Sequence, residues 1–217
     1  MGSPRTRRAR AGAAAAVASL LVLTACGGTE RLEPASAESG GGMHGDTLDE
    51  PYVVPELTLT DTEGEDFDLV TDTDAPLTLV FFGFTNCPDV CNVVMSSLAS
   101  ARTRLSDAQR EDLDVVFVTT DPARDDEATI RSYLDRFDPS FTGLTADIPT
   151  LTEAASAFSI FFEKGDRLPS GGYDVAHGSY VAAVTTDAEG RDRVPVVWDE
   201  QTSAAQFAED VSTLLAR

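Results

Sequence analysis

An apolar run that leads into two cysteines constrains this chain more than any other stretch. Residues 77–82 have the composition of a buried strand, and a glycine and a short polar link follow them. A helix is expected from Pro88, which suits a first helical turn. Cys87 and Cys91 therefore lie at a strand-to-helix corner, four residues apart. Such a pair could bind a metal, cycle through a disulfide, or belong to the core.

The rest of the sequence alternates strand and helix patterns. Residues 61–64 predict a hairpin turn, and residues 115–119 are typical of a central strand covered on both faces. The expected strands are 53–60, 67–70, 77–82, 115–119, 160–163, 180–185 and 194–198, and the expected helices are 88–105, one ending at residue 137, 150–158 and 202–215. This order predicts an α/β class, best matched by a thioredoxin-like fold with an N-terminal β-hairpin extension.

Residues 1–25 have the pattern of a lipoprotein signal peptide. Four arginines up to Arg10 precede an apolar segment, residues 11–23, that is too short for a membrane span of roughly 20 residues. The sequence LTAC at residues 23–26 resembles a bacterial lipobox, in which Cys26 would be lipidated. We therefore expect export and a lipid anchor on the outer face of the cytoplasmic membrane, where disulfides can persist. An ordinary cleaved signal peptide is the alternative.

Residues 26–50 have the composition of a flexible tether. They include His44, which we interpret as a solvated linker residue; transient metal capture by Met43 and His44 is the alternative. Residues 51–217 are long enough for one domain with its own core.

The charge of the chain limits its partners. Beyond the signal it keeps 12 basic residues against 37 acidic ones, a formal charge of −25. Nucleic acid and anionic lipid headgroups are therefore poor partners, and contact with the membrane is expected through the lipid anchor only.

If Cys26 carries lipid, Cys87 and Cys91 remain as a single pair. Helical residues four apart place their Cβ atoms about 5–6 Å apart, whereas a disulfide prefers about 3.8 Å. The wider spacing suits two sulfurs on one metal ion at about 2.3 Å each. The spacing favours a metal but leaves a redox disulfide open, because the backbone at Cys87 can adjust. The helix N-terminus favours thiolates, and Asp89 opposes them.

His177 is the one histidine available as a third ligand within residues 51–217. It precedes a late strand, in a glycine-bearing loop that a thioredoxin-type sheet would place beside the cysteine corner. Two sulfurs and one imidazole suit copper or zinc, and three ligands without an evident fourth favour monovalent copper. A structural or solvent-exposed histidine is the alternative.

Four blocks of the sequence resemble the Sco/SenC family, in the family's order: FFGFTNCPDVC at 81–91, DPARD at 121–125, GLT at 143–145 and YDVAHGS at 173–179. The resemblance implies a membrane-tethered copper protein of thioredoxin fold, with Cys87, Cys91 and His177 as copper ligands. It would help to assemble the binuclear copper centre of a respiratory haem–copper oxidase. The implied partners are the copper-receiving oxidase subunit and other copper carriers, and we expect a monomer.

The same resemblance implies that Asp121 tunes the site or the docking surface, with a turn or helix-entry residue as the alternative. Phe82 and Phe84 are expected beside the site or simply in the core. Departures from the family pattern occur at Asn86, Asn92, Ala176 and Gly178. They remove no proposed ligand, so they bear on tuning and partner specificity.

A membrane-tethered thiol–disulfide oxidoreductase, acting on cysteines of an exported target, is the alternative function. Three residues separate Cys87 from Cys91, where thioredoxin-like enzymes usually have two. No proline directly precedes Ser179, where those enzymes place a cis-proline. We therefore favour a metal carrier that turns nothing over, rather than an enzyme.

Overall fold

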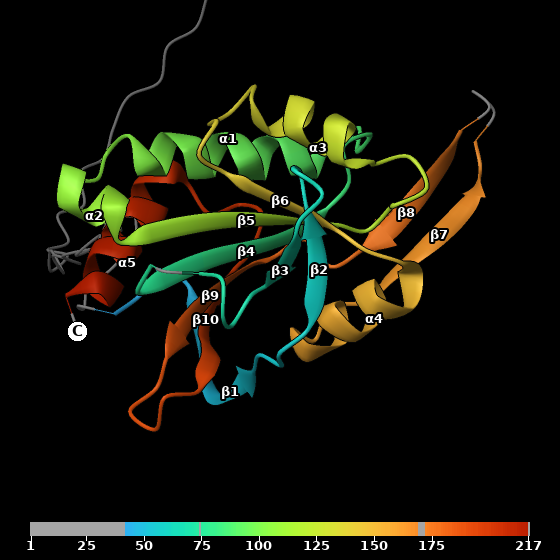
Figure 1. The fold of residues 1–217 in the computed structure, drawn as a ribbon. Coiled ribbons are helices and arrows are strands. Elements are labelled where there is room, and N and C mark those ends of the chain that lie inside the picture. The colour runs from blue at the N-terminus through green and yellow to red at the C-terminus, as the bar shows by residue number, and fades with distance from the viewer. Residues whose placement is uncertain (1–41, 74, 169–171, 217) are drawn as a thin grey trace, which may run out of the picture. The chain divides into compact units, whose positions relative to one another are not determined.

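A computed structural model describes residues 42–73, 75–168 and 172–216, and Figure 1 shows how their strands and helices are arranged. The strands are β1 (Asp46–Val53), β2 (Thr58–Asp61), β3 (Asp66–Asp68), β4 (Leu77–Gly83), β5 (Leu113–Thr119), β6 (Thr142–Thr145), β7 (Phe162–Arg167), β8 (Tyr173–His177), β9 (Val181–Thr186) and β10 (Asp192–Trp198). The helices are α1 (Val90–Arg102), α2 (Asp107–Glu111), α3 (Glu127–Leu134), α4 (Ile148–Ala157) and α5 (Ala204–Leu215).

Eight of these strands form one mixed sheet, in the order β1-β10-β9-β4-β5-β6-β2-β3. Strands β4, β5 and β6 are parallel, and β9 runs antiparallel to β4. Strands β7 and β8 pair with each other in a separate antiparallel hairpin. The units β4–α1–β5 and β9–β10–α5 supply the predicted α/β core, and the predicted hairpin is present as β2–β3.

Helices cover both faces of the central strands, which explains why every residue of β4 is buried and nearly all are apolar. Leu77, Leu79 and Phe81 pack in one cluster with residues of α1, α3 and α5. Val80 and Phe82 point the other way, into a second cluster that contains residues of α4. Successive side chains of a strand alternate between its two faces, so a strand covered on both sides needs no polar positions.

The parallel strands β4 and β5 end at the same edge of the sheet, where the cysteine loop begins. Backbone N–H of Thr120 donates to the carbonyl of Gly83 at 2.7 Å, so the two strand ends stay together. A turn follows, in which N–H of Cys87 donates to the carbonyl of Phe84 at 3.1 Å. Helix α1 then starts at Val90, without a side-chain hydrogen bond from its N-cap residue, Asp89.

The folded unit begins earlier than the predicted boundary at Pro51. Residues 46–50 belong to β1, which pairs with β10, and the predicted strand 53–60 is divided between β1 and β2. Just before β1, the carboxylate of Asp210 accepts the backbone N–H groups of His44 and Gly45. Strand β1 is polar and mostly exposed, so its composition resembled that of a tether. The sequence patterns also missed α2, β6 and β8.

The predicted signal peptide, Cys26 and the first part of the predicted tether lie outside the described residues. Within the described ranges, no helix combines the length and the apolar character needed to cross a membrane.

Candidate metal centre

The structure brings together the three residues that the sequence pointed to. Sγ of Cys87, Sγ of Cys91 and a ring nitrogen of His177 all lie within 4.8 Å of one another. Two sulfurs on opposite sides of one ion, at about 2.3 Å each, would be about 4.6 Å apart. The described ranges hold no other group of three or more histidine, cysteine or acidic side chains with this geometry. The donors therefore fit one soft metal ion.

Both cysteines are free thiols with little exposure to solvent. Cys87 lies in the loop before α1 and is 7% exposed, and Cys91 lies in the first turn of α1 and is fully buried. Gly83 makes room for Cys91, because a Cβ atom there would lie 3.0 Å from Sγ of Cys91 and 2.8 Å from the Phe81 ring.

His177 ends β8, and its ring orientation is fixed by its neighbours. Nδ1 lies 2.9 Å from the carbonyl oxygen of Gly178, and Nε2 lies 3.7 Å from Sγ of Cys91. Because a carbonyl only accepts, Nδ1 carries the proton and donates, which leaves the lone pair of Nε2 facing the cysteines. The rings of Phe84 and Phe81 pack edge-on, with centroids 5.6 and 6.4 Å from that of His177.

The two thiols have opposite acidities. A hydrogen bond from Cys91 holds the pKa of Cys87 well below its usual value, aided by His177 and by backbone N–H groups at the start of α1, although burial opposes this. The same hydrogen bond, together with burial, raises the pKa of Cys91. A metal that binds both sulfurs as thiolates must therefore displace the proton that the raised pKa favours on Cys91.

A buried carboxylate, which the sequence analysis did not single out, supports the cysteine loop. Asp125 is fully buried and accepts three hydrogen bonds at 2.6 to 2.9 Å. Two come from the backbone N–H and the hydroxyl of Thr85, and one comes from the hydroxyl of Thr119. Asp125 thus ties the residue two positions before Cys87 to the end of β5. Its only signal in the sequence is its place in the block at 121–125.

Asp121 is 4% exposed and lies beside the hairpin that carries His177. Its carboxylate accepts a hydrogen bond from the Tyr173 hydroxyl at 2.6 Å and pairs with the guanidinium of Arg124. This burial leaves its carboxylate little surface with which to contact a docking partner. Of the two phenylalanines expected near the site, Phe84 contacts His177, whereas Phe82 packs against Phe158 in the other core cluster.

His44 is exposed, as the sequence suggested, but it belongs to the folded domain and not to a flexible linker. Its Nε2 lies 2.8 Å from a carboxylate oxygen of Glu209, and its backbone N–H donates to Asp210. Met43 packs against the core. His44 therefore contacts α5 and Met43 contacts the core, so neither side chain lies with the cysteines.

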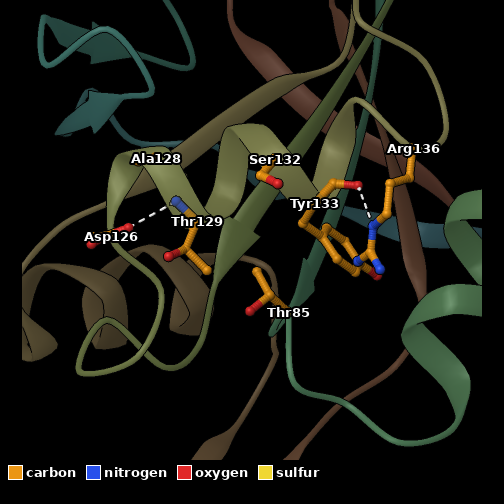
Figure 2. Close-up of a pocket in the computed structure, with 7 residues that line it drawn as sticks. All are labelled: Thr85, Asp126, Ala128, Thr129, Ser132, Tyr133 and Arg136. Carbon is orange, nitrogen blue, oxygen red and sulfur yellow. Dashed lines mark hydrogen bonds between the residues drawn. The ribbon is translucent and has the colours of Figure 1, made fainter.

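A hollow of about 500 Å³ lies beside the cysteine loop, between Thr85 and α3. Figure 2 shows the side chains that line it: Thr85, Asp126, Ala128, Thr129, Ser132, Tyr133 and Arg136. None of the three metal-ligand candidates is among them, so the candidate metal centre is a separate and more buried feature.

Known proteins share both the sequence and the fold of this domain. A family model described as SCO1/SenC matches residues 45–216. The chain belongs to the SCO1/SenC family. A protein of Stutzerimonas stutzeri, named for copper binding, is 32% identical over 148 residues, which cover 67% of this chain and 72% of that protein. The match spans about half the length of two mitochondrial yeast relatives, 46% of SCO1 and 54% of SCO2.

Solved structures of Sco proteins confirm the thioredoxin-like fold. Apo Sco1 from Thermus thermophilus is 31% identical with a TM-score of 0.68, over 81% of this chain and 96% of that one. The structure of Bradyrhizobium japonicum ScoI with copper bound is 25% identical with a TM-score of 0.63, over 75% of this chain and 99% of that one. The fold predicted from the strand and helix patterns is therefore correct.

Proposed function

We propose that this protein is a copper metallochaperone that binds copper through Cys87, Cys91 and His177. The observation that carries the proposal is the convergence of these three donors within 4.8 Å, although His177 lies 86 residues beyond Cys91. The ring of His177 presents Nε2 towards the sulfurs with its proton already on Nδ1. Membership of a family with copper-bound structures supports copper as the cargo.

The donor set favours copper over zinc. Structural zinc sites are almost always four-coordinate, whereas the described cluster offers two thiolates and one imidazole. Soft thiolates select monovalent copper. The half-buried His177 lies at the outer side of the pair, so the metal can be reached without unfolding the core. Low coordination and partial access suit an ion that must be handed on.

We also propose the receiving partner and the place of action. The copper would pass to a respiratory haem–copper oxidase subunit that is to carry a binuclear copper centre, and other copper carriers would supply it. Cys26 would carry the lipid that holds the domain at the outer face of the cytoplasmic membrane. The pattern of residues 1–26 and the family membership support these assignments.

Metal titration of the reduced full chain tests the ligand set. We expect tight binding of one equivalent of monovalent copper, weaker binding of zinc, and a large loss of copper affinity in His177→Ala. His44→Ala is the matched control, because it removes the other histidine of the chain, which contacts Glu209. Unchanged affinity and an unchanged copper absorption spectrum in His177→Ala would show that His177 is not a ligand.

The acidity of the cysteine pair favours one second candidate, a thiol–disulfide oxidoreductase. The lowered pKa of Cys87 makes it the thiolate that could attack a target disulfide, and Cys91 would resolve the mixed disulfide. The target would gain two thiols, and the protein would end with a Cys87–Cys91 disulfide. Reduction of a model disulfide at thioredoxin-like rates would place this function first.

A further inference from the structure

The hairpin that carries His177 is not part of the main sheet. Its strands β7 and β8 hydrogen-bond to each other in a two-stranded sheet, and Figure 1 shows them set apart from the central strands. His177 pairs with Phe162 at the end of the hairpin nearest the domain, and Tyr173 pairs with Arg167 at the end nearest its turn. The position of the third metal-ligand candidate therefore depends on what holds this hairpin against the domain.

Alternation along β8 turns three side chains towards the domain. Tyr173 and His177 are half-buried and Val175 is 4% exposed, whereas Asp174 and Ala176 are exposed. Residues i, i+2 and i+4 of a strand share one face. Val175 packs in the same core cluster as both cysteines, and His177 faces Cys91. Tyr173 is the third point of attachment.

Tyr173 is held by polar contacts to the loop that follows β5. Its hydroxyl donates to Asp121 at 2.6 Å, and its backbone carbonyl accepts from Nη1 of Arg124 at 3.0 Å. The Arg124 guanidinium carbon lies 3.8 Å from the centre of the Tyr173 ring and 5.6 Å from that of Phe84. Arg124 also pairs with Asp121, so the three side chains contact one another. We call Tyr173, Asp121 and Arg124 the hairpin clamp.

The clamp connects the two halves of the candidate site. Asp121 and Arg124 lie between the end of β5 and Asp125, which holds the cysteine loop through Thr85. Tyr173 lies on the same strand and face as His177. A cation in contact with an aromatic face and a hydrogen bond to a buried carboxylate are both strong when shielded from water. Fixing Tyr173 therefore fixes the strand that ends at His177.

We propose that Tyr173, through the hairpin clamp, is a positioning residue for His177 and sets how often Nε2 faces the cysteines. The inference rests on the proposed copper site and names a residue that would not touch the metal. When the clamp is broken, the hairpin keeps its own strand pairing but loses one of the three contacts that β8 makes with the domain. The apparent copper affinity then falls in proportion to the fraction of molecules in which Nε2 of His177 still faces the cysteines.

Tyr173→Phe tests this, because it removes the hydroxyl bond to Asp121 and keeps the ring beside Arg124. We expect copper affinity, measured by competition with a monovalent-copper chelator on the reduced full chain, to fall about 3- to 10-fold. Arg124→Lys should lower it in the same way, because lysine lacks the planar guanidinium that reaches Tyr173 and Asp121 together. Tyr180→Phe is the matched control, because the buried Tyr180 hydroxyl has no hydrogen-bond partner among the residues that the structure describes.

A double-mutant comparison separates positioning from general damage. In a His177→Ala background, Tyr173→Phe should leave copper affinity unchanged, because the ligand that it positions is gone. An equal loss in both backgrounds, or no loss in Tyr173→Phe alone, would overturn the proposal.

A metal-free measurement distinguishes this inference from the proposed function. NMR of the reduced protein without metal should show shifted or broadened His177 ring resonances in Tyr173→Phe and not in Tyr180→Phe. If the wild-type chain bound no copper but these resonances still moved, the copper function would fail and the positioning role would stand. Unchanged His177 resonances in Tyr173→Phe would overturn the positioning role.

Discussion

At the level of single residues, the candidate site depends on a glycine, Gly83, that leaves space for Cys91. Gly83 ends β4 directly beneath Cys91, and its missing side chain leaves space for the sulfur and for the Phe81 ring. The glycine therefore serves packing against the cysteine pair, at the strand end where the loop begins.

Gly83→Ala should destabilise the domain and disturb the cysteine pair. A methyl group would lie 2.8 to 3.1 Å from the Phe81 and Phe117 rings and from Sγ of Cys91. Overpacking of this kind costs about 1–3 kcal/mol. Urea unfolding would measure the loss, and copper titration would show the effect on the site. Gly172→Ala is the control, because among the described residues other than its chain neighbours the nearest atom to its new Cβ is 3.9 Å away; equal effects of the two changes would contradict this account.

Asp125 should make part of the stability depend on pH. Burial raises the pKa of this carboxyl above its ordinary value of 3.8, although its three hydrogen bonds lower it. The unfolded chain therefore ionises first, and Asp125 contributes stability in acid that is lost as pH rises through its folded pKa. The difference in unfolding free energy between wild type and Asp125→Asn should shrink as pH rises above about 4. A difference that grows over that interval would show that the hydrogen bonds outweigh burial.

At the level of elements, the connection from α4 into β7 carries local strain. Ser159 follows the helix with φ of 58°, and N–H of Ile160 donates back to the carbonyl of Ala155 at 2.8 Å. This left-handed position after a helix usually belongs to glycine. The connection also sets where β7 begins, and thus where the hairpin that carries His177 leaves the domain.

Ser159→Gly should stabilise the protein by about 0.5–1 kcal/mol, because glycine adopts positive φ without steric cost. Thermal or urea unfolding would detect the change. Gly190→Ala is the reciprocal control, since Gly190 has φ of 76° and open space around it, and it should destabilise by a similar amount. A destabilised Ser159→Gly would mean that backbone freedom in the unfolded chain matters more than the strain.

At the level of the whole molecule, the described N-terminal segment is joined to the C-terminal helix. The carboxylate of Asp210, which is 2% exposed, accepts the backbone N–H groups of His44 and Gly45 and the indole N–H of Trp198 at 2.7 to 3.0 Å. Strand β1 then pairs with β10 at the edge of the sheet. The domain is closed by contacts between residues more than 160 positions apart.

A chain that starts at Pro51 should be less stable than one that starts at Gly42. The shorter chain loses the pairs Asp46–Val197 and Thr47–Val196, together with two donors to Asp210. At about 1 kcal/mol for each net hydrogen bond, we expect a loss of about 2–4 kcal/mol in unfolding free energy. Equal denaturation midpoints for the two chains would show that residues 42–50 add nothing to the fold.

The sequence alone determined the centre of this molecule and the identity of its candidate ligands. The buried strands β4 and β5 are mostly apolar along their length because both faces are covered, and that pattern is visible without a structure. Cys87 and Cys91 stand four residues apart at the start of a predicted helix, although α1 begins only at Val90, and His177 was the one histidine left beyond the tether. These features are local, so local rules recover them.

Only the tertiary structure decided how those residues are held. The polar strand β1, the buried Asp125 and the bond from Tyr173 to Asp121 depend on partners between 6 and more than 100 positions away, and no local periodicity encodes such pairings. The sequence does not distinguish a buried charged side chain from a solvated one, because the difference depends on a partner that only the fold supplies. For the same reason, the sequence could nominate His177, but only the packing of β8 against the cysteine loop turned its Nε2 towards Cys91.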